Sequence, residues 1–224
     1  MKHHTVYFKP ARLVFVAACT LLCAATSQAG TLSFQVDVNT APLLGNPNGP
    51  FSLDFQLNPG TGAATNSVSL YNFAFSSGNA TGSPTLIGNA AGSLTSSVSL
   101  NDASDTNSEF FQGFSATTTH ITFDATLTEN VDPTTPDAFV MAVLDNNLFN
   151  IPTPGLGDSL LLANISVSNL SLANFQKFTS TSPDAGVTVS VSPTPEPGTL
   201  GLGLAAGLIA MGSFARRRFA LPKN

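Results

Sequence analysis

The segment between residues 30 and 194 of this 224-residue chain lacks cysteine, because Cys19 and Cys23 both lie closer to the N-terminus. A disulfide framework is therefore excluded there, and the fold of this segment depends on its apolar core. The chain has no tryptophan, and the segment has one tyrosine, Tyr71, and one histidine, His120. Zinc binding has no support from this composition, since zinc sites need several histidine or cysteine ligands.

Basic residues are almost absent from the same segment. It holds 12 of the 13 carboxylates but only one of the eight basic residues, Lys177, so that its formal charge is −11. A domain of this charge repels phosphate backbones, and we expect it to bind no nucleic acid. The acidity is typical of a soluble surface. A cation-dependent role is the alternative.

The first 29 residues have the pattern of a secretory signal peptide. Lys2, Lys9 and Arg12 precede an apolar run from Leu13 to Ala25. This order of a basic and then an apolar region is what the Sec export machinery accepts. The run has about 13 residues, which is too short to span a membrane comfortably, so a permanent N-terminal anchor is disfavoured.

The end of this leader predicts where it is removed. Ser27-Gln28-Ala29 places small residues at the two positions that signal peptidase reads, which predicts cleavage between Ala29 and Gly30. Val16-Ala17-Ala18-Cys19 loosely matches a lipobox, so a lipoprotein is the alternative. Cleavage there leaves an apolar region of only six residues, Leu13 to Ala18, which weighs against it.

The C-terminal segment, residues 193–224, has three parts in a fixed order. A Pro-Glu-Pro motif precedes an apolar run over residues 199–215, and an arginine cluster follows that run; these residues are Pro195, Glu196, Pro197, Arg216, Arg217 and Arg218. Seventeen helical residues reach about 25 Å, slightly less than a bilayer core, so the arginines have to snorkel. The cluster is expected to stay in the cytoplasm, which places the preceding domain outside the inner membrane.

This tail resembles the PEP-CTERM sorting signal over about 30 residues, from Pro193 to the end. The resemblance implies recognition by an exosortase, a membrane-embedded cysteine protease or transpeptidase, through Pro195, Glu196 and Pro197. It also implies a bacterium that makes extracellular polysaccharide. The prolines keep the motif extended and open to a protease. A permanent single-span anchor is the alternative, and the four glycines of the apolar run weigh against it.

Strand patterns dominate residues 30–192. Apolar and polar residues alternate over 32–38, 51–57 and 121–127, which is typical of half-buried strands. Further strands are expected near residues 67–75, 93–100, 108–114, 138–144, 160–168 and 187–191. The run 138–144 is apolar on both faces and predicts a central strand. A shift of apolar parity between Leu70 and Tyr71 predicts a β-bulge.

Turn-forming residues separate these strands, for example in 45–50, 58–60, 79–82 and 152–155. A short helix over Leu170 to Phe178 is the single helical candidate. The pattern predicts one all-β domain, a single antiparallel β-sandwich or jelly roll, between an N-terminal signal peptide (1–29) and a C-terminal transmembrane helix.

The segment between residues 30 and 194 contains few residues suited to nucleophilic catalysis. A Ser-His-Asp arrangement needs His120, and no Gly-x-Ser-x-Gly motif accompanies it, so we read His120 as a solvated residue at a strand edge. Glycoside hydrolysis needs two facing carboxylates, and twelve carboxylates make some pair inevitable. We therefore expect no enzyme, and rank a hydrolase third among the functions.

An acidic loop is the sharpest candidate metal site. Asp102, Asp105, Asn107 and Glu109 place four oxygen ligands within eight residues. Calcium prefers six to eight oxygens, but this spacing is not an EF-hand loop, and such clusters also form ordinary turns. No other cofactor is expected. Serine and threonine make up 43 of residues 30–194, for which strand propensity or O-glycosylation can account.

These patterns predict an exported protein that is held briefly at the inner membrane by its tail and then released or attached at the cell surface or in the matrix. Its β domain is expected to be structural or to mediate interactions. A calcium-stabilised carbohydrate-binding module that acts on extracellular polysaccharide is the alternative. The expected partners are the Sec machinery, signal peptidase, an exosortase and, in the alternative, that polysaccharide.

Overall fold

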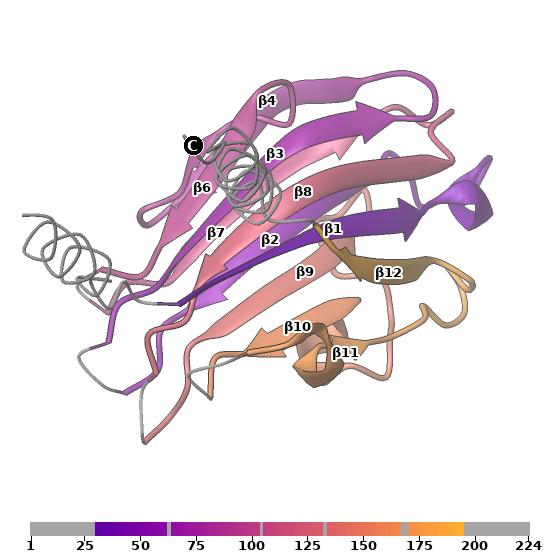
Figure 1. Cartoon of the computed structure of the whole chain (residues 1–224). Coiled ribbons are helices and arrows are strands. Elements are labelled where there is room, and N and C mark those ends of the chain that lie inside the picture. Colours follow the sequence, from indigo (N-terminus) through magenta and orange to yellow (C-terminus); the bar gives the residue numbers. More distant parts are fainter. Residues whose placement is uncertain (1–29, 62–63, 104, 132–133, 167–169, 195–224) are drawn as a thin grey trace, which may run out of the picture.

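In the computed structural model, the residues described are 30–61, 64–103, 105–131, 134–166 and 170–194. They form two six-stranded antiparallel sheets packed face to face, which confirms the predicted all-β sandwich. Figure 1 shows β1 and β8 of one sheet crossing in front of β2 and β9 of the other. The predicted signal peptide and the predicted sorting tail lie outside the described residues.

We call the two sheets A and B. Sheet A has the order β12-β1-β8-β3-β6-β5, and sheet B the order β11-β10-β9-β2-β7-β4. The strands of sheet A are β1 (Thr31–Asn39), β3 (Ser67–Phe75), β5 (Ala91–Gly92), β6 (Ser97–Asn101), β8 (His120–Thr128) and β12 (Thr188–Pro193). The strands of sheet B are β2 (Ser52–Asn58), β4 (Ala80–Ile87), β7 (Ser108–Phe114), β9 (Ala138–Leu144), β10 (Leu161–Asn164) and β11 (Gln176–Lys177). The 3₁₀ helices are η1 (Ala41–Leu43), η2 (Leu156–Asp158) and η3 (Leu172–Asn174).

The strands pair in a nested order. β1 pairs with β8, β2 with β7 and β3 with β6, and the chain changes sheet at nearly every connection from β1 to β9. The nesting stops there, since β4 pairs with β7 and β5 with β6. The fold alone says nothing about function, because sandwich architectures serve many unrelated ones.

The core consists of the inward-facing residues of both sheets, as the alternation in the sequence predicts. Phe55 of β2 is fully buried at its centre, with ring centroids 6.2 Å from Phe73, 6.1 Å from Phe110 and 5.3 Å from Phe123. Aromatic pairs at such distances add to the stability that burial of their area provides. A domain without disulfides thus has a continuous apolar core between its sheets.

The predicted irregularity in β3 is confirmed. The register of β3 with β8 shifts between Tyr71 and Ala74, and Asn72 has a positive φ of 57°. Asparagine tolerates this left-handed conformation better than most residues. The bulge reconciles the two apolar parities of the strand, and it lies one to three residues beyond the predicted position.

Two local predictions were wrong. Residues 79–82 were expected to form a turn, but Ala80 begins β4, an edge strand in which Pro84 is tolerated because one side needs no hydrogen bonds. The segment Leu170 to Phe178, the candidate for a short helix, holds only the three-residue η3 and then β11. Ser171 and Asn174 cap η3 reciprocally, and Phe175 turns into the core beside Phe34.

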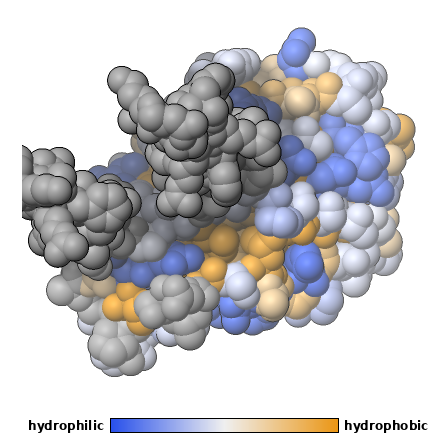
Figure 2. Space-filling model, in the orientation of Figure 1, coloured by the Kyte–Doolittle hydropathy of each residue, from blue (hydrophilic) through white to orange (hydrophobic). Residues whose placement is uncertain are grey.

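The surface over sheet A mixes hydrophilic and hydrophobic residues. Figure 2 shows a hydrophobic band across the middle of this view, between the places where Figure 1 shows β1 and β10. The partly buried residues packed against the core include Leu32, Leu172 and Val191.

Candidate functional site

A pocket lies on the outer face of sheet B, where two rows of side chains cross three strands. Because cross-strand partners share a face, the register places Asn164, Ala138 and Asn58 in one row. It places Leu162, Val140 and Gln56 in the next row. These six residues form the floor of the pocket.

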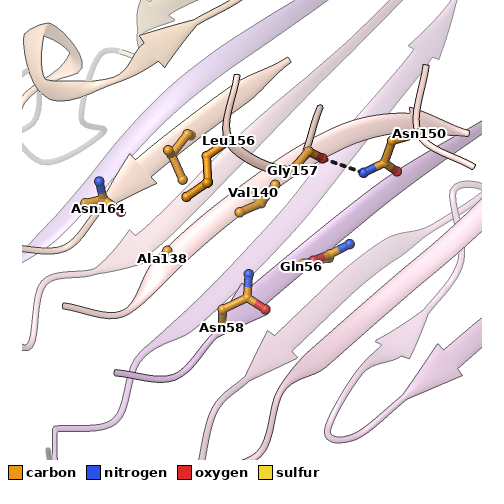
Figure 3. Close-up of a pocket in the computed structure, with 9 residues that line it drawn as sticks. Gln56, Asn58, Ala138, Val140, Asn150, Leu156, Gly157 and Asn164 are labelled. Carbon is orange, nitrogen blue, oxygen red and sulfur yellow. Dashed lines mark hydrogen bonds between the residues drawn. The ribbon is translucent and has the colours of Figure 1, made fainter. Parts of the chain in front are cut away.

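The loop after β9 covers this floor. Asn150, Leu156 and Gly157 complete the lining, and the pocket has a volume of about 280 Å³. Figure 3 shows the loop passing over the strands, with Leu156 above Val140 and with Gln56 and Asn58 on the β2 side. We call the pocket formed by these nine residues the amide pocket, because four of them carry carboxamides; the nine are Gln56, Asn58, Ala138, Val140, Asn150, Leu156, Gly157, Leu162 and Asn164.

Hydrogen bonds hold the covering loop in place. Asn150 Nδ2 donates to the carbonyl of Gly157 over 2.7 Å, as the dashed line in Figure 3 marks. Gly157 has a φ of 62°, which glycine adopts without strain. Thr153 Oγ1 donates to the carbonyl of Ser159 over 2.8 Å, and Asp158 Oδ1 accepts from the Thr153 N–H over 3.0 Å. The loop is therefore fixed to itself at both ends of η2.

The carboxamides of the floor differ in how they are held. Gln56 Nε2 donates to Asp54 Oδ2 over 2.7 Å, which leaves its oxygen for other partners. Among the described residues, the side chains of Asn58 and Asn164 have no hydrogen-bond partner, although both line the pocket. Each amide offers two donors and one acceptor oxygen. The floor thus presents unused hydrogen-bonding groups.

Asp54 lies beside the pocket on the same outer face, yet solvent does not reach it. Its register partners are Ala142 and Phe111, and its Oδ1 has no hydrogen-bond partner in the described part of the chain. Burial raises the pKa of Asp54 to about 7, although the hydrogen bond from Gln56 lowers it, and the charge of Glu109 raises it slightly. Burial also raises the pKa of Glu109. Asp54, which lies in the same strand as Gln56 and Asn58, therefore carries less negative charge near pH 7 than its sequence suggests.

The acidic loop does not gather around one point. Asp102 is buried at the end of β6, where its Oδ1 accepts from the backbone N–H of Asn66 over 2.6 Å. Glu109 instead lies in β7 of the other sheet, in register with Gln56. Within the described ranges, no group of three or more His, Cys, Asp or Glu residues is placed to hold a metal ion.

The other two predicted calcium ligands lie between these positions. Asp105 adopts a positive φ of 51° in the connection from β6 to β7, and Asn107 directly precedes β7. The structure therefore does not gather the four predicted calcium ligands around one point. The calcium site stays a prediction, which a binding measurement has to test.

Asp102 has a different partner, which the sequence did not indicate. Asn66 Nδ2 donates to Asp137 Oδ2 over 2.6 Å, and the Gly60 N–H donates to Asp137 Oδ1 over 2.5 Å. Burial is the largest cause that raises the pKa of Asp102 to about 6; the Asn66 N–H lowers it, and the hydrogen bond and charge of Asp137 raise it. Asp102 Oδ2 has no hydrogen-bond partner among the described residues, so a negative charge on this buried carboxyl group is costly.

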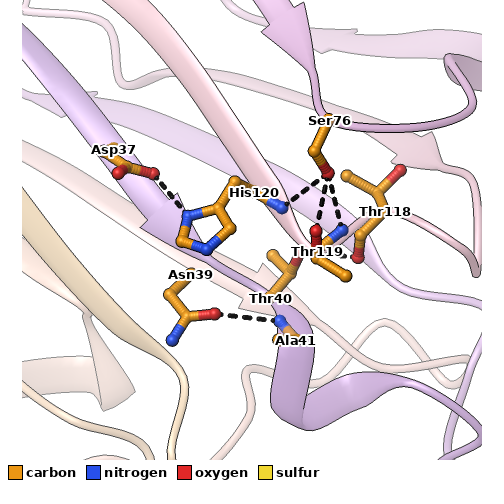
Figure 4. A network of polar contacts seen from close by, with 8 residues as sticks. All are labelled: Asp37, Asn39, Thr40, Ala41, Ser76, Thr118, Thr119 and His120. Atoms are coloured by element: carbon orange, nitrogen blue, oxygen red, sulfur yellow. Dashed lines mark hydrogen bonds and ion pairs between the residues drawn. The ribbon is translucent and has the colours of Figure 1, made fainter.

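His120 stands in a Ser-His-Asp arrangement that lacks the decisive contact. Its Nδ1 lies 3.0 Å from Asp37 Oδ1, and both side chains are nearly half exposed. Figure 4 shows that Ser76 Oγ instead accepts from the backbone N–H groups of Thr119 and His120 and contacts Thr119 Oγ1. A catalytic serine must donate to the other ring nitrogen of the histidine. This serine ties two strand ends together.

The structure does not describe the residues predicted for signal cleavage and sorting, except Gly30. The cleavage position after Ala29, the motif Pro195, Glu196 and Pro197, and the arginines 216–218 fall outside the described residues, apart from Gly30, which precedes β1. In the described segments, no helix has the length and apolar character needed to cross a bilayer.

Comparisons with protein families, with curated proteins and with solved structures found no match to this chain. The site has to be interpreted from its own geometry. The sequence signals that could have located the amide pocket are the outward parity of Gln56 and Asn58 and the glycine- and proline-rich loop 150–158 after a central strand.

Proposed function

We propose that this protein is exported, sorted at the inner membrane by an exosortase through its C-terminal signal, and then displayed at the cell surface or in the extracellular matrix. Its β-sandwich serves there as a non-catalytic structural or interaction domain. The proposal combines the two terminal sequence patterns with the fold and the site that lie between them.

The observation that carries this proposal is the position of the sandwich between the two signals. Strand β1 begins at Thr31, two residues after the predicted cleavage position at Ala29, and β12 ends at Pro193, two residues before Pro195. These two strands pair with each other along the edge of sheet A, from Phe34 opposite Pro193 to Asn39 opposite Thr188. Removal of residues 1–29 and of the tail from Pro195 onward therefore takes away no described strand.

The chemistry of the described residues supports a non-catalytic domain. The hydroxyl oxygen of Ser76 accepts hydrogen bonds from the backbone N–H groups of Thr119 and His120. The imidazole ring of His120 contacts Asp37, and no hydrogen bond joins it to Ser76 within the described residues. Asp54, which has the strongly raised pKa expected of an acid catalyst, is fully buried and does not reach a substrate in the pocket. The amide pocket offers binding groups without a nucleophile.

The proposal is tested by following the chain in the producing cells. We expect the wild-type chain to appear first as a membrane-bound intermediate and later as a shorter, surface or released form. Deletion of the exosortase, or replacement of Pro195, Glu196 and Pro197 by alanine, should keep the intermediate in the membrane fraction. Replacement of Ser190 and Ser192 by alanine is the matched control, because these residues precede the motif. The proposal would be rejected by a full-length chain in the cytosol. It would also be rejected if the chain with Pro195, Glu196 and Pro197 replaced by alanine matured like the wild type.

A further inference from the structure

We propose that the amide pocket binds one unit of an uncharged saccharide, and that it does so without a metal ion. This inference rests on the proposed role of the sandwich as an interaction domain and assigns that role to one site. Four observations carry it: the lack of charge in the lining, the unused carboxamides, the apolar patches among them, and the fixed covering loop.

The ligand is expected to be uncharged because the lining contains no charged residue. The nine lining residues include no Asp, Glu, Lys, Arg or His, although the segment 30–194 holds twelve carboxylates. An anionic ligand would find no cation in the lining to pair with, and Lys177 of β11 is in register with Leu161, not with the lining residue Leu162. A cationic ligand would lack a carboxylate within the pocket itself.

The hydrogen-bonding groups suit neighbouring hydroxyls. Each free carboxamide of Asn58 and Asn164 presents a donor and an acceptor side by side, and adjacent hydroxyl groups of a sugar ring present the reverse pair. The oxygens of Gln56 and Asn150 add two more acceptors, since their nitrogens are already bonded to Asp54 and Gly157. A polar ligand that met fewer groups would leave carboxamides unpaired on binding.

Aliphatic side chains complete this surface. Val140 and Leu162 lie between the carboxamides on the floor, and Leu156 stands at the rim with 80% of its surface exposed. The C–H groups of a sugar ring can cover such a patch. The pocket lacks the Trp or Tyr platform that strengthens sugar binding, so we expect dissociation constants on the order of 1 mM per site.

The pocket is also arranged before a ligand arrives. The bond from Asn150 to Gly157 and the bonds within the loop fix the cover, and Asp54 fixes the amide of Gln56. Groups that are already ordered lose less conformational entropy on binding. Because the lining supplies the contacts and no carboxylate, chelation of calcium is expected to leave binding unchanged.

The test uses the full ¹⁵N-labelled chain, kept in a detergent without a sugar headgroup, and a titration followed by the side-chain amide signals. The probes are neutral tetrasaccharides of glucose, mannose and galactose in different linkages, with galacturonic acid oligomers as the anionic comparison. We expect at least one neutral probe to shift the signals of Asn58 and Asn164 while that of Asn79 stays in place. Asn79 is exposed before β4 and is the matched control.

Substitutions make the test quantitative. Asn58→Ala and Asn164→Ala should each weaken binding about 5- to 10-fold, as expected for the loss of one or two hydrogen bonds, and Asn79→Ala should not. EDTA should have no effect. The inference is overturned if no neutral probe binds, if both variants bind like the wild type, or if the anionic oligomers bind more tightly.

The outcomes separate this inference from the proposed function. Loss of saccharide binding with normal maturation in cells would remove the pocket's assignment and leave the sorting proposal intact. Cleavage of a bound tetrasaccharide, seen as shorter products, would contradict the non-catalytic role while keeping the pocket.

Discussion

Gln56 Nε2 donates a hydrogen bond of 2.7 Å to Asp54 Oδ2 and so joins a residue that lines the amide pocket to a carboxyl group that solvent does not reach. The second oxygen of Asp54 has no partner among the described residues. A buried carboxyl group in this position is costly when ionised and acceptable when protonated. The stability of the domain is therefore expected to depend on pH through this group.

Asp54 should make the domain more stable in acid than at alkaline pH. Its pKa in the fold is about 7, above the ordinary 3.8, so the folded state binds the proton more tightly than the unfolded state. Stability therefore falls as the pH rises from about 4 to about 7, and levels off above, by up to about 4 kcal/mol. Urea denaturation at several pH values measures this slope.

The variant Asp54→Asn isolates the contribution. Its side chain keeps an oxygen for Gln56 and carries no charge, so we expect it to be more stable than the wild type at pH 8 and similar to it at pH 4. Asp37→Asn, on the outer face of sheet A, is the control. A wild type that is as stable at pH 8 as at pH 4, or an Asp54→Asn variant with an unchanged pH slope, would contradict the raised pKa.

Asn66 should be among the most sensitive polar residues of the domain. Its side chain donates to the carbonyl of Asn130 and to Asp137, and it accepts from Thr128 and from the Asn130 N–H. Replacement by alanine leaves several buried groups unpaired, so we expect Asn66→Ala to cost about 3 kcal/mol of unfolding free energy.

Asn79→Ala provides the baseline for this measurement and should change stability by less than about 0.5 kcal/mol. Both variants are compared by denaturant unfolding at one pH. A loss at Asn66 no larger than that at Asn79 would show that the network around Asp137 does not stabilise the fold.

Phe55 tests the centre of the core. It is fully buried and packs against three phenylalanines from β3, β7 and β8. Phe55→Ala should lower the free energy of unfolding by about 3–5 kcal/mol because it leaves a cavity, and Phe55→Leu should cost less because it keeps most of the volume. Equal losses for both variants would argue against a tightly packed site.

Calcium provides a separate test of the acidic loop. Asp102 and Glu109 interact with different groups in different sheets, so we expect about 1 mM Ca²⁺ to leave the melting temperature unchanged. EDTA should likewise have no effect. A rise of several degrees that Asp105→Asn abolishes would instead restore the four-residue site that the sequence suggests.

Much of the fold followed from the sequence because burial imposes a period of two. The alternation in 32–38, 51–57 and 121–127 predicted β1, β2 and β8, and the doubly apolar run 138–144 predicted that β9 is central. Strand β4 was not predicted, because it is an exposed edge strand that contains Gly82 and Pro84. It has no buried face, so its sequence shows no alternation of apolar and polar residues.

The candidate site was much less predictable. The spacing of residues 102–109 suggested one metal site, but β6 and β7 belong to different sheets, so the loop carries Asp102 and Glu109 to different partners. The structure instead brings together distant positions: Asn66 bonds to Asp137, and Asn58 and Asn164 lie in one row on either side of β9. Which strands become neighbours determines such proximities, and the local pattern of one strand does not name its neighbours.

The most direct measurement for the central claim is the intact mass of the protein recovered from the culture of its native host. Export and sorting predict a polypeptide that begins at Gly30 and has lost its arginine cluster, with any added mass reporting attachment or glycosylation. A mass equal to that of residues 1–224, in a form free of membrane, would contradict the account.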